Sequence, residues 1–386
     1  MNKNLKFIDS FDSIDESQFN KLIHEDDAPF IQYSFLKALE NSGCVGRDFG
    51  WTPKHLIKSN KNILSGFLPI YIKNNSHGEF VFDHSWSYAL NRAGRNYYPK
   101  LLTAIPFTPC ETRKIITESD SDEYIEKVID LMEEKNIETW HVLYPDSNLK
   151  ELFLKNNLIE RFGYKFIWRN KGYEEFDDYL SIFKSRQRKN IKNERKKISD
   201  LNITFQIKGS DSLTAKDWDD FFKFYKNTYE ERLQRPYLNI DFFKEIHKFR
   251  ESLRPVIFFA LHDNKKIAGS LCFAGNDTLY GRHWGSSYNI DSLHFETCFY
   301  QGIEFCIKNK LKFFDPGVQG EHKIRRGFEP KRTSSFHYIK EKDFRGAILE
   351  FCEKEQDEIN RYLKACLLYT SPSPRDLRAS RMPSSA

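Results

Sequence analysis

Residues 256–284 read V-I-F-F-A-L-H-D-N-K-K-I-A-G-S-L-C-F-A-G-N-D-T-L-Y-G-R-H-W, and this stretch decides the fold. Three apolar runs are separated by the turn sequences Asp263-Asn264 and Gly275-Asn276-Asp277. Short Asn- and Gly-containing turns of this kind join neighbouring antiparallel strands. The stretch therefore predicts a three-stranded meander, with strands at Val256–His262, Lys265–Phe273 and Thr278–Trp284.

Helical patterns surround this meander. Before it we expect helices at Phe176–Ser199, Ala215–Arg232 and Ile240–Phe249, with a strand at Ile203–Ile207. After it we expect a helix at Leu293–Asn309, strands at Lys312–Asp315 and Ser334–Ile339, and a last helix from Phe344. This order predicts one α/β lobe over residues 173–365.

The first part of the chain is a looser copy of the same pattern, and it predicts a first lobe over residues 1–172. Helices are expected at Pro29–Ser42, around Ile125–Met132 and at Asn148–Asn156. Strands are expected at Lys54–Lys58, Ile63–Ile72, Phe80–Phe82, Thr139–Leu143 and Tyr164–Arg169. Asp83–Pro109 has no clear periodicity, which indicates a long aromatic loop. The predicted fold class is α/β, with two tandem lobes that each hold a mixed, mainly antiparallel sheet flanked by helices.

Composition limits the function classes. The 386 residues are 39% hydrophobic, which excludes a disordered chain, and the net charge of +5 permits an anionic partner without requiring one. The start is not a secretory signal, and no apolar stretch is long enough to span a membrane. Seven cysteines without a C-x-x-C pair favour reduced thiols in a cytoplasmic protein.

The last segment, residues 366–386, differs from the rest of the chain. It is rich in Ser, Pro and Arg, and it resembles the conceptual translation of a sequencing adapter. We interpret it as a non-native read-through tail and exclude it from the fold argument. On this interpretation the helix that runs up to Lys364 has lost its natural ending.

Several longer motifs point to a known family. They are Tyr280–Gly285 (Y-G-R-H-W-G), Phe295–Thr297 (F-E-T), residues 313–330 (F-F-D-P-G-V-Q-G-E-H-K-I-R-R-G-F-E-P) and residues 97–109 (Y-Y-P-K-L-L-T-A-I-P-F-T-P). Together they resemble a bacterial family of peptidoglycan biosynthesis/recognition proteins, which is similar to the Fem aminoacyltransferases and is placed in the GNAT superfamily. The resemblance implies two GNAT-like lobes and transfer of an acyl or aminoacyl group to an amine.

One segment departs from ordinary GNAT enzymes. Enzymes of that superfamily that use acetyl-CoA carry a glycine-containing turn before the long helix, where backbone N–H groups hold a pyrophosphate. Here the corresponding residues 285–292 have no glycine pair, and Asp291 lies near the helix start, where it competes with a phosphate. The acyl donor is therefore either an aminoacyl-tRNA, which the Fem resemblance favours, or an acyl-CoA, and no tightly bound cofactor is expected.

Two carboxylates are candidates for the catalytic base. Glu296 lies in the first turn of an amphipathic helix and projects from its apolar face, near Phe299, Ile303 and Ile307. It is either a base with a raised pKa or a structural ion-pair partner of Arg282 or His283. Asp315 ends a strand before Pro-Gly and is either a catalytic group or an ordinary turn residue.

The glycine-bounded loop that follows is rich in charge. It suits an anionic ligand, or it is a solvated loop, and His322 is its candidate proton shuttle. The predicted substrate-binding residues of the second lobe are Gln319, Glu321, Lys323, Arg325 and Arg326 in this loop, with His283 and Trp284 on the preceding strand. His283 is alternatively a core histidine.

Residues 184–197 hold eight basic side chains and one acidic side chain. Arg186, Arg188, Lys189 and Lys192 on this helix are candidate nucleic-acid contacts, which would suit a donor carried by tRNA. Alternatively the segment is a soluble basic helix.

In the first lobe, a mixed aromatic and polar cluster is a candidate substrate site or a self-packed loop. Its members are Asp83, His84, Trp86, Tyr97, Tyr98 and Lys100. No metal-ligand spacing and no G-x-S-x-G nucleophile motif occur, so we expect direct transfer without a metal.

The leading hypothesis is a Fem-like acyltransferase acting on a small-molecule or cell-wall-precursor acceptor, with Glu296 or Asp315 as base and the cationic loop holding an anionic group in one shared crevice. An acetyl-CoA-dependent N-acetyltransferase and a non-catalytic protein that binds cell-wall precursors or RNA are the alternatives.

Overall fold

The computed structural model describes residues 4–118, 121–318 and 320–370. The chain divides into two compact units that are each built from separate segments. Unit 1 comprises residues 1–163, 236–254 and 332–360, and unit 2 comprises residues 164–235, 255–331 and 361–386. Residues 236–254 and 332–360, which lie in the predicted second lobe, therefore pack with the first unit.

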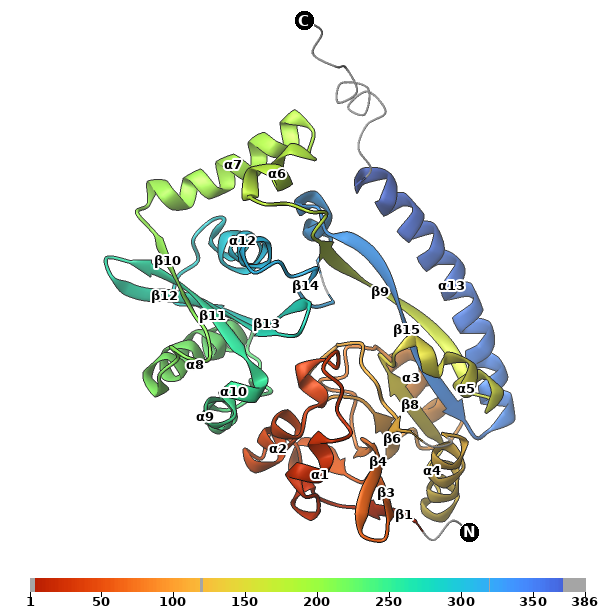
Figure 1. Ribbon diagram of the computed structural model, residues 1–386. Coiled ribbons are helices and arrows are strands. Elements are labelled where there is room, and N and C mark those ends of the chain that lie inside the picture. Colours follow the sequence, from red (N-terminus) through yellow and green to blue (C-terminus); the bar gives the residue numbers. More distant parts are fainter. Residues whose placement is uncertain (1–3, 119–120, 319, 371–386) are drawn as a thin grey trace, which may run out of the picture. The chain divides into compact units, whose positions relative to one another are not determined.

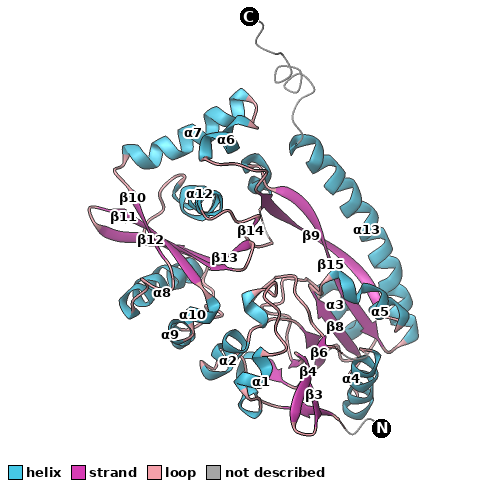
Figure 2. Ribbon diagram, viewed as in Figure 1, coloured by secondary structure: helices cyan, strands magenta, loops and turns pink. Residues whose placement is uncertain are grey.

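The sheet of unit 2 is built around the predicted meander (Figures 1 and 2). Strands β11 (Pro255–His262), β12 (Lys265–Ala274) and β13 (Thr278–Ser286) pair antiparallel in sequence order. Strand β10 (Thr204–Lys208) extends the sheet antiparallel to β11, and β14 (Phe313–Asp315) pairs parallel to β13. The last residues of β9 (Ile159–Arg169) pair antiparallel to β14.

Helices cover both faces of this sheet. Helix α8 (Ala215–Glu230) lies on one face, and α12 (Gln301–Lys308) lies on the other (Figure 1). The approach of α8 depends on Gly285, because a Cβ there would lie 1.9 Å from the carbonyl oxygen of Phe224. Helix α12 continues from α11 (Leu293–Phe295) through a π-helical segment, Glu296–Tyr300.

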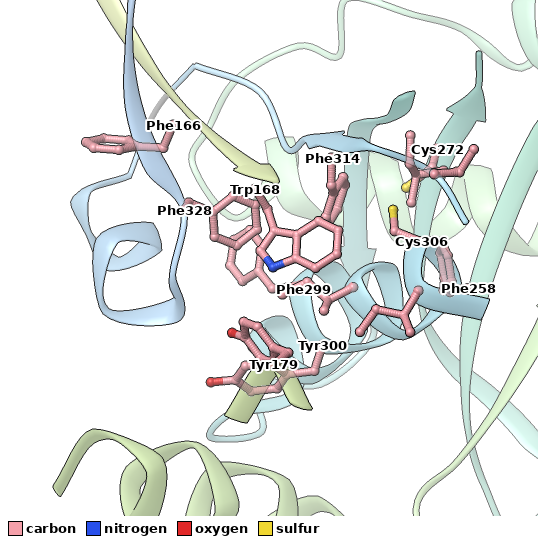
Figure 3. Close-up of a cluster of buried hydrophobic side chains, with 14 of the residues drawn as sticks. Phe166, Trp168, Tyr179, Phe258, Cys272, Phe299, Tyr300, Cys306, Phe314 and Phe328 are labelled. Carbon is pink, nitrogen blue, oxygen red and sulfur yellow. The ribbon is translucent and has the colours of Figure 1, made fainter. Parts of the chain in front are cut away.

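The core of unit 2 lies between the sheet and the helix that contains Tyr300. Figure 3 shows its aromatic centre, where Trp168, Phe299, Phe314 and Phe328 lie together. The ring centroids of Phe314 and Phe328 are 5.7 Å apart. Since Phe314 precedes Asp315 and Phe328 closes the cationic loop, this packing fixes both ends of residues 315–328.

Unit 1 contains two groups of strands. One antiparallel sheet has the order β1-β3-β4-β7. The other strands run in the order β2-β5-β6-β8-β15, with β6 and β8 parallel and the remaining pairs antiparallel. The strand bounds are β1 (Leu5–Ile8), β2 (Trp51–Pro53), β3 (His55–Asn60), β4 (Ile63–Leu68), β5 (Tyr71–Lys73), β6 (Lys100–Thr103), β7 (Ile116–Thr117), β8 (Thr139–Leu143) and β15 (Glu329–Ile339).

The helices of unit 1 pack around these strands. Helix α4 contributes Ile125, Val128 and Met132 to the core, as its periodicity predicts. The bounds are α1 (Glu16–Asn20), α2 (Tyr33–Asn41), α3 (His84–Arg92), α4 (Asp122–Lys135), α5 (Lys150–Lys155), α9 (Ile240–Lys248) and α10 (Arg250–Leu253), followed by α13 (Lys342–Thr370), which continues beyond the unit.

Several local predictions differ from the structure. Residues 80–82 form no strand, and the expected loop Asp83–Pro109 contains helix α3 and strand β6. The expected helix Phe176–Ser199 is divided into α6 (Phe176–Ser181) and α7 (Ser185–Asp200), because Phe183 turns into the core between them. Helix α13 also includes residues 366–370 of the segment interpreted as a tail, whereas residues 371–386 lie outside the described part.

The predicted α/β class, with mainly antiparallel mixed sheets flanked by helices, is confirmed. The division into lobes at residue 172 stays a prediction. Within residues 4–118, 121–318 and 320–370, none of the helices combines the length and the hydropathy that crossing a bilayer requires.

Candidate active site

Strands β13 and β14 separate where the candidate catalytic residues begin. The two strands pair from Thr278–Phe313 to Tyr280–Asp315, and β14 ends there while β13 continues to Ser286. A bulge in the pairing of β12 with β13 leaves Arg282 without an opposite residue. Bulges redirect side chains at such strand edges. The Arg282 guanidinium comes within 3.7 Å of the Asp315 carboxylate.

Asp315 is a buried, ionised carboxylate. Its Oδ2 accepts a hydrogen bond from Lys165 Nζ at 3.2 Å, and its Oδ1 accepts one from the Gly317 N–H at 2.9 Å. Burial raises the pKa of Asp315, but Lys165 and Arg282 outweigh burial and hold the pKa at about 2. A carboxylate this acidic is a weak proton acceptor near pH 7, so its contribution is electrostatic.

Lys323 is almost entirely buried, and it is close enough for the charge of this carboxylate to act on its pKa without a direct ion pair between them. Its Nζ donates to the carbonyl oxygens of Gly317 at 2.8 Å and Pro316 at 3.3 Å. An ammonium group has three N–H donors, so one remains without an acceptor among the described residues. Burial lowers the pKa of Lys323 to about 8, and Asp315 opposes that shift. The group is therefore mainly charged at pH 7.

His322 lies in an aromatic pocket and not in this charged cluster. Its ring centroid is 5.5 Å from those of Phe295 and Phe299 and 6.1 Å from that of His294. Burial and Arg326 lower the pKa of His322 to about 4, so the ring is neutral at pH 7. Its Nε2 is buried without a hydrogen-bond partner in the described part of the chain.

Arg326 is a fixed structural cation. Its guanidinium donates to Glu194 Oε1 at 2.7 Å and to the Tyr300 hydroxyl at 3.0 Å, and it lies 3.5 Å from the centre of the Phe295 ring. It also donates to the His322 carbonyl oxygen at 2.9 Å. Because these contacts use its donors, Arg326 holds the loop in place and is not open to a ligand.

Glu296 is paired with Arg195, a residue of helix α7. Arg195 Nη2 and Nε contact the two carboxylate oxygens at 3.0 and 3.1 Å, and Gln301 Nε2 donates to Oε1 at 2.8 Å. Burial raises the pKa of Glu296, and Arg195 opposes this. The ion-pair interpretation of Glu296 therefore describes its contacts, but the partner is Arg195 and not Arg282 or His283.

The charged residues do not meet in one crevice. Asp315 and Lys323 lie together, whereas Glu296 lines a pocket formed with helices α6 and α7 that includes none of Asp315, Lys323 and Arg326. Glu296 and Arg326 are instead held by two different residues of α7, Arg195 and Glu194, so the described residues do not bring the two carboxylates and the cationic loop to one pocket as the sequence hypothesis requires.

The other predicted residues of unit 2 are dispersed. His283 packs against Tyr225 of α8 with ring centroids 5.1 Å apart, and burial lowers its pKa to about 3. Trp284 packs against His294 at 5.3 Å. Glu321 accepts a hydrogen bond from the Tyr362 hydroxyl, and Arg325 is exposed. Gln319 lies outside the described residues.

The Arg195–Glu296 pair gives a testable stability effect. Arg195→Met leaves the buried Glu296 carboxylate without its cation, so we expect a loss of roughly 3 kcal/mol in the free energy of unfolding at pH 7. Because an unpaired Glu296 is stabilised by protonation, the loss should shrink as the pH falls from 7 to 5. Urea unfolding of Arg195→Met and of the double variant Arg195→Met/Glu296→Gln measures this. A single variant as stable as the double variant would contradict it.

The candidate cluster of unit 1 is a buried network and not an open site. Lys100 Nζ donates to Glu79 Oε2 and Ser76 Oγ, both at 2.8 Å, and also pairs with Asp83. The Tyr97 hydroxyl donates to Asp83 Oδ2 at 2.6 Å. Burial lowers the pKa of Lys100, but Glu79 and Asp83 outweigh burial and raise it overall.

This network continues through two histidines. His141 Nε2 is 3.1 Å from the Tyr97 hydroxyl, and His141 Nδ1 is 2.7 Å from Nδ1 of His337. The Trp86 ring packs against His337 at 4.8 Å, so it is part of the core. Of the six predicted residues, Asp83, Trp86, Tyr97 and Lys100 are buried, Tyr98 is half-buried and bonded to Ser76, and His84 is exposed.

The basic helix α7 presents its predicted contacts to solvent. Arg186, Lys189 and Lys192 are exposed and Arg188 is half-buried, while Ile191 and Ile198 anchor the other face. The arrangement fits the predicted contacts with phosphates, which stay a prediction.

Sequence reasoning missed Lys165 and Arg195, and it named Arg282 as a possible partner of Glu296 and not of Asp315. For Arg195 a signal was present, because the spacing Ile191, Arg195, Ile198 places the arginine on the buried face of α7. Arg282 lies near Asp315 at a β-bulge that no sequence motif predicts. Among the described residues, no group of three or more His, Cys, Asp and Glu side chains could hold a metal ion.

Comparison with known proteins gives a family match over most of the chain. The family model FemAB_like, described as peptidoglycan biosynthesis/recognition, matches residues 10–371, which confirms the resemblance drawn from the motifs. A search of curated proteins found no match to this sequence.

Comparison with solved structures finds similar chains, three of which are the following. The C-terminal domain (DUF2156) of a putative lysylphosphatidylglycerol synthetase from Agrobacterium fabrum has a TM-score of 0.52 at 9% identity, over 89% of this chain and 97% of that chain. FemX has a TM-score of 0.48 at 11% identity, over 85% of this chain and 96% of that chain. A tandem GNAT protein from the clavulanic acid biosynthesis pathway has a TM-score of 0.44 at 8% identity, over 87% of this chain and 98% of that chain. Of these three, the first supports a shared fold.

Proposed function

This chain belongs to the FemAB_like family of peptidoglycan biosynthesis/recognition proteins, and on that premise we propose that it is an acyltransferase that moves an activated acyl or aminoacyl group onto an amine acceptor. The observation that carries the proposal is the buried ammonium group of Lys323, which lies within the electrostatic influence of Asp315 where β13 and β14 separate. Ligands commonly bind where neighbouring strands of an α/β sheet diverge.

In this proposal Lys323 stabilises the oxyanion. The acceptor amine attacks the carbonyl carbon of the donor, the new C–N bond forms, and the C–O or C–S bond to the leaving group breaks. The amine proton passes to the leaving oxygen or sulfur. The free N–H of Lys323 donates to the carbonyl oxygen as negative charge develops there, and a preorganised donor of this kind stabilises the transition state.

Asp315 is a positioning residue for this step. Its negative charge raises the pKa of Lys323 and so keeps the ammonium protonated at neutral pH. Its contact with the Gly317 N–H also fixes the backbone whose carbonyl oxygen accepts from Lys323. Glu296 has no role in the step, because both of its oxygens are paired with Arg195.

For the donor, we propose an aminoacyl-tRNA. The helix start that holds a pyrophosphate in coenzyme A enzymes is here next to Asp291, which forms a 2.6 Å ion pair with Lys197 of α7. The exposed cations Arg186, Lys189 and Lys192 could neutralise RNA phosphates. The acceptor class that the family description suggests is the amine of a cell-wall precursor.

A transfer assay tests the proposal. The purified protein is mixed with charged tRNA or acetyl-CoA and with amine-containing peptidoglycan precursors, and mass spectrometry measures the mass gained by the acceptor. We expect product with charged tRNA and about 10-fold less with Asp315→Asn, because a lost charge partner costs on the order of 1.4 kcal/mol. Asp263→Asn, an exposed turn variant, is the matched control.

Each alternative gives a different result in this assay. Product formed with acetyl-CoA instead, together with saturable binding of coenzyme A by calorimetry, would identify an N-acetyltransferase. A protein that binds precursors or RNA but yields no product with either donor, and whose affinities are unchanged in Glu296→Gln and Asp315→Asn, would be a binding protein and would overturn the proposal.

A further inference from the structure

A pocket of about 490 Å³ lies within unit 2 beside helix α7, apart from the Asp315–Lys323 pair. Its volume is in the range of small-molecule sites. The lining comes from α6, α7, the start of β10 and the helix that contains Glu296. The lining residues are Phe176, Asp177, Leu180, Lys192, Arg195, Lys196, Ile198, Ser199, Ile203, Phe205, Glu296 and Gln301.

One wall of this pocket is aliphatic. Leu180, Ile198 and Ile203 are buried, and they belong to core clusters on either side of α7. The Phe176 ring is covered by the Arg195 guanidinium at 4.3 Å, so its face is not free to stack on a flat ligand. The wall therefore suits a flexible alkyl group more than an aromatic base.

The rim of the pocket is cationic. Lys196 is exposed and has no hydrogen bond or ion pair with another described residue. Lys192 Nζ makes one long contact, 3.9 Å from Asp177 Oδ1. Helix α7 therefore supplies two ammonium groups beside the aliphatic wall with little to neutralise them.

Two carboxylates line the pocket, Asp177 at its rim and Glu296 at its base, and each has a cationic partner. Glu296 is neutralised by two contacts from Arg195, and Gln301 donates to the same group. Arg195 is also bonded to Glu304 at 2.7 Å, so one guanidinium holds two carboxylates in place at the base of the pocket. The exposed cations at the rim are Lys196 and Lys192, and Lys192 shares the long contact with Asp177.

We propose that this pocket binds an aliphatic anion, an alkyl chain that ends in a carboxylate or a phosphate. The chain lies along Leu180, Ile198 and Ile203, and the head group contacts Lys192 and Lys196. The pocket does not include Asp315 or Lys323, so binding does not require that the chain is a transferase, although Lys192 is also one of the proposed contacts with tRNA.

Calorimetry with four probes tests this. Decanoate, decyl phosphate, decanol and decyltrimethylammonium are titrated below their micelle concentrations into the full chain. We expect saturable binding of at least one of the two anions and none of the cation or the alcohol. Which anion binds more tightly distinguishes a carboxylate from a phosphate head group. Saturable binding of decanol with the same affinity as the anions would overturn the assignment of the head group.

Two double variants locate the site. Lys192→Glu/Lys196→Glu should weaken anion binding about tenfold, because two attractions near the surface become repulsions. The matched control Arg186→Glu/Lys189→Glu carries the same charge change on the same helix, away from the lining residues, and should leave binding within about twofold. Equal weakening in both double variants, or no saturable binding of either anion to the unmodified chain, would overturn the proposal.

Discussion

Replacement of Lys323 by methionine is expected to lower kcat for acyl transfer by about two to three orders of magnitude, because it removes the donor that meets the developing oxyanion. Methionine has nearly the same length as lysine and is tolerated in apolar surroundings, so the fold should persist. Steady-state kinetics of Lys323→Met and of the exposed helix variant Lys308→Met, with circular dichroism of both, measure the effect. A kcat for Lys323→Met equal to that of the control would remove Lys323 from the mechanism.

The pH profile separates this role from a structural one. Lys323 has a pKa of about 8, and its charged form is the active one, so kcat should fall as the pH rises through 8. Arginine stays charged far above pH 8, so kcat of Lys323→Arg should not fall as the pH rises through 8, although the different shape of arginine lowers the rate. Asp315→Asn removes the charge that raises the Lys323 pKa and should move the fall to lower pH. A profile that rises through pH 8 would make Lys323 a base instead.

The largest effect on stability is expected in unit 1, from Lys100→Met. This change leaves two buried carboxylates, Glu79 and Asp83, without their shared cation, and the loss should be roughly 3–5 kcal/mol. Differential scanning calorimetry of Lys100→Met beside Lys127→Met, a change on the outer face of α4, measures it. A melting temperature within a degree or two of the control would contradict the expectation.

The sign of the pH dependence follows from the carboxylates. Burial already raises the pKa of Glu79 to about 7, and without Lys100 the charged form becomes still less favourable. A folded-state pKa above the unfolded value means that folded Glu79 binds protons more readily, so stability increases as the pH falls from 7 towards 4.5. The deficit of Lys100→Met should therefore be smaller at pH 5 than at pH 8.

Much of the fold follows from local sequence signals. The turns Asp263-Asn264 and Gly275-Asn276-Asp277 fix the meander, and the period of Ile125, Val128 and Met132 fixes α4. The discontinuous units do not follow from such signals, because the return of residues 236–254 and 332–360 to unit 1 depends on contacts between distant segments. Helix α3, in the aromatic stretch after Asp83, was likewise not predicted. Its buried residues are Trp86 and Leu90, and two apolar positions give too weak a periodicity to indicate a helix.

The candidate site was predictable in part. Asp315 and Lys323 could be selected because a strand end and a glycine-bounded loop place charged groups near each other. Their pKa values could not, because these depend on Lys165 and Arg282, which come from other strands and, for Arg282, from a bulge. Arg326 was selected by the same loop criterion, and Glu296 by its place on the apolar face of a helix, yet both are paired with adjacent residues of α7.

Those adjacent residues determine how helix α7 is oriented about its own axis. Glu194 pairs with Arg326 and its neighbour Arg195 pairs with Glu296, and successive residues of a helix point about 100° apart. A roll by one residue in one sense would bring Arg195 against Arg326, and a roll in the other sense would bring Glu194 against Glu296. Either rotation replaces an attraction by a like-charge contact. The rotation of α7 about its own axis is therefore fixed, and its exposed lysines always point in the same direction.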